Sequence, residues 1–196
     1  TWRNMDGDDV NVPTISGSTY AIVAQGGSSA TAPFGMQDSI WSWAMASPFS
    51  MNDWGEISPS GPTVGGIQKA SQGSMRTPTD AYIAGGNDGT QGSSTRVDMI
   101  KKFNLASPSS ATDVGEMSQV KDDTATGCDL TYGAIAGGET HPASRLDTIE
   151  TMTLSASPGN SVDSGAELTA TNKFVGGASN VGDSSMYVFS GSPSNA

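Results

Sequence analysis

The chain has 196 residues and a formal net charge of −11, from 9 basic and 20 acidic side chains. A surface this acidic argues against nucleic-acid partners and against docking on anionic membranes, and no apolar run approaches the ~20 residues that a spanning helix needs. One cysteine and one histidine exclude a disulfide framework, a four-ligand cysteine and histidine zinc site, and a haem held by two histidines.

An internal repeat is the main feature along the chain. Three segments share an Asp-x-Ile motif, at 38–40, 98–100 and 147–149. Each is followed by Ala-Ser-Pro, at 46–48, 106–108 and 156–158, and each is preceded by a small apolar run that ends in two glycines. The glycine pairs are Gly26 with Gly27, Gly85 with Gly86, and Gly137 with Gly138. We expect each pair to stand where the chain turns with positive φ or passes close to a neighbour.

A second motif lies five residues after each of these prolines. It is Asp-x-Gly, and its members are Asp53 and Gly55, Asp113 and Gly115, and Asp163 and Gly165. With the serine before it, as in Ser50-x-x-Asp53-x-Gly55, the motif resembles the Asp-box of sialidases, in which serine and aspartate are one residue closer and which forms a structural turn. We predict a structural turn here too, in which the carboxylate accepts backbone N–H groups and the glycine supplies positive φ.

Within one copy the side chains alternate with a period of two, which is typical of strands. In the second copy this predicts strands at about 69–75, 81–85, 99–105 and 113–118. Trp43, Phe103 and Met152 occupy one repeated slot and are expected to face a shared core. No segment shows an apolar stripe of helical period.

Four short strands in each unit of about 50–60 residues predict an all-β, β-propeller-like fold built of repeated four-stranded blades. A β-sandwich is the competing architecture. We expect one repeat domain over residues 1–196, with full units at about 10–58, 69–118 and 121–168. A partial unit follows at 173–191, and residues 1–9 are a candidate strand to close it.

Trp41 is the one candidate interface residue. It shares a slot with Lys101 and Glu150, and these charged equivalents place it in solvent. Strict alternation puts it instead on the same face as Trp43. An exposed tryptophan favours a partner, so we predict that Trp41 contacts one.

We expect no catalytic or ligand-binding role for the other candidate residues. The acidic run 6–9 lacks the spacing of a calcium loop and is expected to be solvated. The single histidine, His141, lies in an expected loop, with no nucleophile motif at triad spacing. Cys128 is expected to be a small buried residue. We therefore predict no catalytic residue, no metal ligand and no cofactor.

The glycine pair after a strand, once per unit, resembles kelch and galactose-oxidase-like propellers, although the tyrosine that usually follows the glycines is absent. The repeat more closely resembles the kelch-like repeats of marine bacteriophage structural proteins. The residues that carry this likeness are Ala84-Gly85-Gly86, Val97-Asp98-Met99-Ile100, Ala106-Ser107 and Ala111-Thr112-Asp113-Val114-Gly115. The resemblance implies a virion component of a tail, fibre or capsid surface.

We therefore expect a non-enzymatic structural or attachment protein of a phage particle, located in the virion and in the host cytoplasm during assembly. Its expected partners are other virion proteins, copies of itself or a host surface glycan. A lectin-like, carbohydrate-binding propeller is one alternative, and a sialidase-like glycoside hydrolase is another. A copper oxidase of the galactose-oxidase kind needs two histidine ligands, and only His141 exists.

Overall fold

The computed structural model describes residues 20–24, 39–44, 51–57, 73–86, 96–140, 144–155, 157–173, 176–180, 182–189 and 192–193. Their regular structure consists of β-strands, and no helix occurs among them. Accordingly, the described part of the chain holds no helix that is long and apolar enough to cross a membrane.

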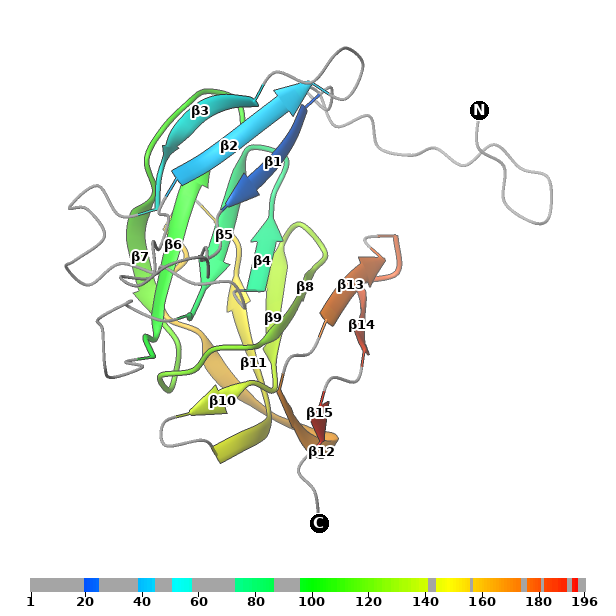
Figure 1. Cartoon of the computed structure of the whole chain (residues 1–196). Coiled ribbons are helices and arrows are strands. Elements are labelled where there is room, and N and C mark those ends of the chain that lie inside the picture. Colours follow the sequence, from blue (N-terminus) through cyan, green and yellow to red (C-terminus); the bar gives the residue numbers. More distant parts are fainter. Residues whose placement is uncertain are drawn as a thin grey trace, which may run out of the picture.

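Sheet I is the first of four antiparallel sheets that follow one another along the chain (Figure 1). It contains β1 (Tyr20–Ala24), β2 (Ser39–Ala44) and β3 (Met51–Glu56), which pair in that order. Isoleucine and serine side chains of β2 are buried, with Ile40 0% and Ser42 1% exposed. They therefore define the face of sheet I that packs on the next sheet.

Sheet II is a four-stranded meander. Its strands are β4 (Gly73–Arg76), β5 (Asp80–Ala84), β6 (Met99–Asn104) and β7 (Thr112–Glu116), paired in sequence order. The period-two pattern of this unit predicts the same four strands to within a few residues at each described end.

Sheet III repeats this meander and extends it. Its four main strands are β8 (Ala125–Cys128), β9 (Tyr132–Ala136), β11 (Ser144–Thr153) and β12 (Val162–Lys173). Two short strands lie at its margins: β10 (Glu139–Thr140) pairs with β11, and β15 (Ser192–Pro193) pairs with β12.

Sheet IV is a hairpin of β13 (Gly176–Asn180) and β14 (Ser185–Phe189). It contacts β8 through both strands. Both strands lie within the predicted partial unit at 173–191, where they take the place of the first two strands of a blade.

Three apolar clusters lie between successive sheets. Ile40, Ile57, Ile83 and Phe103 join sheet I to sheet II. A second cluster joins sheet II to sheet III, and its buried members are Met75, Tyr82, Ala84, Ile100, Met117, Ile135, Met152 and Leu154. A third cluster joins sheet III to sheet IV around Ala125, Ala136, Met186 and Val188. Sheets II and III thus bury both faces against their neighbours, and sheets I and IV each bury one face in the same way, which is how propeller blades stack.

The fold is therefore all-β and propeller-like. Of the predicted core slot, Phe103 and Met152 are each 4% exposed, whereas the side chain of Trp43 lies outside the described residues. The predicted boundaries of the units remain predictions, and residues 1–9 also lie outside the described part.

Candidate functional site

The glycine pairs stand where one sheet meets the linker into the next. Gly85 and Gly137 have φ of +70° and +64°. The second glycine of each pair donates its N–H across the junction, from Gly86 to the Lys121 carbonyl at 3.1 Å and from Gly138 to the Asn172 carbonyl at 2.9 Å. A Cβ on Gly85 would lie 2.5 Å from the Lys121 carbonyl oxygen, so the site requires both positive φ and close approach. Gly26 and Gly27 lie outside the described residues.

The three Asp-x-Gly motifs make the same local hydrogen bond. The carboxylates of Asp53, Asp113 and Asp163 accept the backbone N–H of the glycine two residues later, at 3.0, 3.2 and 2.8 Å. Gly55 and Gly165 have φ of +149° and +73°.

The predicted positive φ occurs at Gly55 and Gly165 but not at Gly115, where a Cβ would clash with the Gly159 carbonyl, so close approach requires the glycine there. The three motifs also do not form separate turns. They lie inside β3, β7 and β12, at irregularities in the ladder. In sheet II, Ile100 pairs with Gly115 and the adjacent Lys101 pairs with Asp113, which leaves Val114 unpaired in a β-bulge. Because Asx turns and these bulges use the same carboxylate-to-amide bond, the residue pattern alone does not distinguish them.

In sheets II and III, the loop after the third strand docks on the bulge of the preceding sheet. Glu56 N–H donates to Ser110 Oγ at 3.3 Å, and Ala111 N–H donates to the Glu56 carbonyl at 2.7 Å. One unit later, Glu116 N–H donates to Asn160 Oδ1 at 3.0 Å, and Ser161 N–H donates to the Glu116 carbonyl at 2.9 Å. The repeated Ala-Ser-Pro region thus serves sheet-to-sheet docking.

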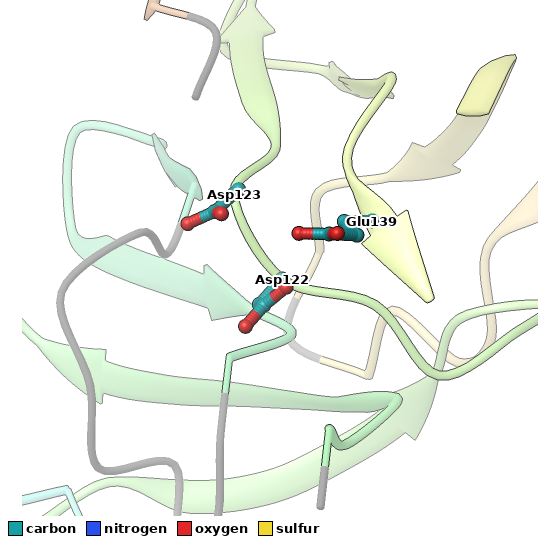
Figure 2. Close-up of side chains that lie close together, drawn as sticks. All are labelled: Asp122, Asp123 and Glu139. Atoms are coloured by element: carbon teal, nitrogen blue, oxygen red, sulfur yellow. The ribbon is translucent and has the colours of Figure 1, made fainter. Parts of the chain in front are cut away.

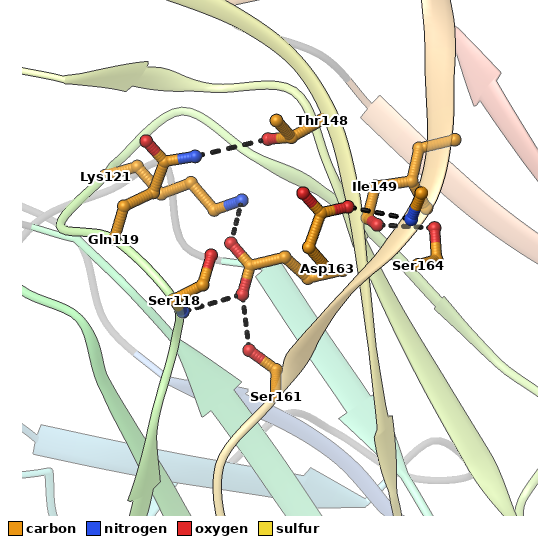
Figure 3. Close-up of polar contacts among 10 residues, drawn as sticks. Ser118, Gln119, Lys121, Thr148, Ile149, Ser161, Asp163 and Ser164 are labelled. Carbon is orange, nitrogen blue, oxygen red and sulfur yellow. Dashed lines mark hydrogen bonds and ion pairs between the residues drawn. The ribbon is translucent and has the colours of Figure 1, made fainter.

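A buried ion pair lies between sheets II and III (Figure 3). Lys121 Nζ is 2.7 Å from Glu150 Oε1, and both side chains are 0% exposed. The other carboxylate oxygen of Glu150 accepts Ser118 N–H at 2.9 Å and Ser161 Oγ–H at 2.5 Å. The carboxylate therefore ties together the linker before β8, strand β11 and the start of β12.

The pKa of Glu150 reflects opposing causes. Burial raises it most strongly among the single causes, but the hydrogen bonds from Lys121, Ser161 and Ser118, with the charge of Lys121, outweigh burial and hold the pKa below its ordinary value of 4.5. The carboxylate is thus ionised near neutral pH, which is the state that a structural ion pair requires.

Lys101, the residue of sheet II in the same slot as Glu150, is also buried. Its Nζ donates to the Ile57 carbonyl at 3.0 Å, and the residue is 6% exposed. The charged residues of this slot therefore bridge successive sheets, and the argument that they place Trp41 in solvent is wrong. Trp41 itself is half-buried.

Acidic side chains gather just before β8, where Asp122, Asp123 and Glu139 bring carboxylate oxygens within 4.8 Å of one another (Figure 2). All three residues are buried. Arg96 joins the cluster, with Nε 2.5 Å from Asp122 Oδ1 and Nη2 3.2 Å from Glu139 Oε2. Three close carboxylates offer the oxygen ligands that a hard cation such as Ca²⁺ prefers. The guanidinium already supplies positive charge to two of them, so the arrangement is that of a structural ion network.

Sequence reasoning missed the partners in both networks. Arg96 and Arg145 stand at equivalent positions of the repeat, and Lys69 and Lys121 each lie 16 residues before the first glycine of a pair. These recurrences were the available signal, but they do not show which carboxylate each cation meets. Cys128, expected to be buried, is only half-buried, and its Sγ accepts Arg76 N–H at 3.4 Å. His141 and the acidic run 6–9 lie outside the described residues.

The comparisons show the fold and leave the family unassigned. No family model matches the chain, and no curated protein matches it. Among solved structures, the chain is similar to YjhT, with a TM-score of 0.54 and 12% identity over 72% of this chain. It is also similar to a fungal alcohol oxidase of the AA5 family in complex with copper, with a TM-score of 0.57 and 10% identity over 79% of this chain.

The alignments cover 42% of the YjhT chain and 33% of the oxidase chain, so this chain spans less than half of each. The structural similarity supports a shared kelch-like propeller architecture, whereas identities this low carry no residue roles.

Proposed function

We propose that the chain is a non-enzymatic structural or attachment component of a bacteriophage particle, acting as a rigid stack of blades that binds through its loops and outward faces. The main support from the structure is that the repeated polar residues make contacts within the scaffold itself. Asp53, Asp113 and Asp163 each bond a nearby backbone amide, and Lys101, Lys121 and Glu150 bridge successive sheets.

These contacts assign the repeated chemistry to the scaffold. Binding then falls to what varies between the units, namely the loops and the two outward faces of the stack. The phage assignment is supported by the resemblance of the repeat, strongest at residues 81–168, to the kelch-like repeats of marine bacteriophage structural proteins. The acidic surface favours specific contacts with protein or glycan over nucleic acid.

The experiment that tests this proposal is protein mass spectrometry of density-purified phage particles from the source of the sequence. The proposal predicts that the chain co-purifies with the particles in a fixed ratio to the major capsid protein. Antibody labelling in electron micrographs should then place it on the tail, a fibre or the capsid surface. A chain that is abundant in the lysate but absent from washed particles would contradict the proposal.

A glycan array separates attachment from a purely structural role. Saturable binding to one class of host-surface glycan would identify the module as the attachment element. Absence of glycan binding, together with presence in the particle, would identify it as a structural subunit.

A further inference from the structure

Two outward sheet faces at opposite ends of the stack carry aromatic residues. In sheet IV, Tyr187 and Phe189 are 53% and 59% exposed. In sheet I, Trp41 is half-buried and lies between Ile40 and Ser42, which are buried toward sheet II. Because side chains alternate along a strand, Trp41 points to the opposite face.

The face of sheet IV has a covered counterpart inside the molecule. Val188 packs toward the preceding sheet III, just as Ile83 packs toward the preceding sheet I. The residue before each of them faces the other side of its sheet, so Tyr187 occupies the position that Tyr82 has in sheet II. Tyr82 is 0% exposed and donates its hydroxyl to the Ser155 carbonyl of the following sheet at 2.7 Å. Tyr187 thus carries the same group at a position where the described chain supplies no following sheet.

The face of sheet I has covered counterparts too. Lys101 and Glu150, in the slot of Trp41, are 6% and 0% exposed because the preceding sheet and its linker cover them. Trp41 offers in that slot a large apolar surface with one N–H donor. It matches an aromatic, largely apolar partner face better than a charged one.

We infer that sheet IV of one copy of this chain binds sheet I of a second copy, so that Tyr187 and Phe189 pack against the face that carries Trp41. The contact continues the interface that already joins sheets I to II and II to III. In this contact, sheet I of the second copy lies where a sheet that follows sheet IV would stand. Because the two faces differ, the association is head-to-tail.

Electrostatics sets a second property of this contact. Each copy carries a formal net charge of −11, so two copies repel at low ionic strength. Added salt screens that repulsion and leaves apolar burial intact. The association should therefore strengthen with salt, which is opposite to the behaviour of an interface held by ion pairs. The inference goes beyond the proposed function and holds whether or not the chain belongs to a particle.

The test is sedimentation velocity on the purified chain and on two variants, Trp41→Asp and Tyr187→Asp. The unaltered chain should form species larger than a monomer by about 100 µM, and it should do so more readily in high salt, as expected for a micromolar contact. Each variant alone should stay monomeric, because each lacks one of the two faces. An equal mixture should form a dimer, since each variant retains the face that the other has lost.

Tyr132→Asp is the matched control. Tyr132 is 59% exposed on sheet III, outside both faces, and its replacement should leave association unchanged. Far-UV circular dichroism checks that each variant keeps its strand content. The inference is overturned if the unaltered chain is monomeric at this concentration, as it would be if another segment covers these faces. It is also overturned if the mixture stays monomeric, which would indicate a symmetric contact or none.

Discussion

Glu150 shows at the scale of one residue how the blades are held together. Removing one partner of a buried ion pair leaves the other charge uncompensated, which typically costs about 3–5 kcal/mol. We predict that Glu150→Gln lowers the free energy of unfolding by about this amount, measured by urea denaturation, because Lys121 Nζ stays buried without its counter-charge. The double variant Lys121→Met with Glu150→Leu should recover part of the loss, because it removes the unpaired charge but leaves Ser118 N–H and Ser161 Oγ–H without their acceptor. A loss below about 1 kcal/mol for Glu150→Gln, the value of an exposed pair, would show that water reaches the site.

The lowered pKa of Glu150 adds a pH dependence. In the unfolded chain this carboxyl takes up its proton near pH 4.5, whereas in the folded chain it stays ionised to lower pH. The unfolded state therefore binds more protons in that interval, so stability from this group is present above pH 4.5 and is lost as pH falls toward the folded value. Denaturation midpoints measured from pH 7 to pH 3 should fall more steeply for the unaltered chain than for Glu150→Gln. Parallel curves would exclude this contribution.

Asp113 shows how solvent exposure lowers the stability that is lost when a hydrogen-bonding side chain is removed. If its glycine amide were buried, Asp113→Ala would cost about 1–3 kcal/mol through an unpaired donor. The hydrogen bond to Gly115 N–H is exposed, however, so water replaces the carboxylate. We predict a smaller loss of about 0.5–1.5 kcal/mol in urea denaturation. A loss of about 2–3 kcal/mol would mean that the bulge is buried.

Phe103 tests packing at the scale of one element. It lies on β6, is 4% exposed and belongs to the cluster between sheets I and II. Phe103→Ala should cost about 3–5 kcal/mol, as large-to-small changes in cores do. Val162→Ala, at a residue 62% exposed, is the control and should change stability by less than about 0.5 kcal/mol. Equal losses of stability for the two substitutions would contradict the assignment of buried and exposed strand faces.

β13 offers a sharper comparison, because two adjacent glycines differ in their surroundings. A Cβ on Gly177 would lie 2.2 Å from the Thr126 carbonyl oxygen, whereas a Cβ on Gly176 would meet nothing closer than Phe189 at 3.8 Å. Gly177→Ala should therefore loosen sheet IV from β8 and speed amide exchange in residues 176–189, while Gly176→Ala should leave exchange there unchanged. Similar exchange in both variants would show that β13 does not approach β8 closely.

The sequence predicted this level of organisation well, because strands leave a period of two and blades leave a repeat. The strands of sheet II and the buried slot of Phe103 and Met152 follow from those two patterns. The sequence does not show which residues of neighbouring sheets contact each other. The slot of Lys101 and Glu150 looks solvated when read one strand at a time, yet it is buried because a neighbouring sheet covers it. The bulge at Asp113 reads as a turn because both use the same residues.

At the scale of the whole molecule, the account rests on successive sheets held together by a repeated set of contacts. The loop-to-bulge bonds at Glu56 and Glu116 and the bridges from Lys101 and Glu150 recur from one sheet to the next. A stack built in this way transmits a local defect to its neighbouring sheet and little further, as expected for quasi-one-dimensional repeats.

Hydrogen exchange measured by mass spectrometry on the unaltered chain and on Glu150→Gln tests this central claim most directly. The account predicts faster exchange in peptides that cover residues 112–124 and 157–165, which meet at Glu150, and unchanged exchange in strands β2 and β3 of sheet I. Equal acceleration along the whole chain, or no change at the junction of sheets II and III, would contradict it.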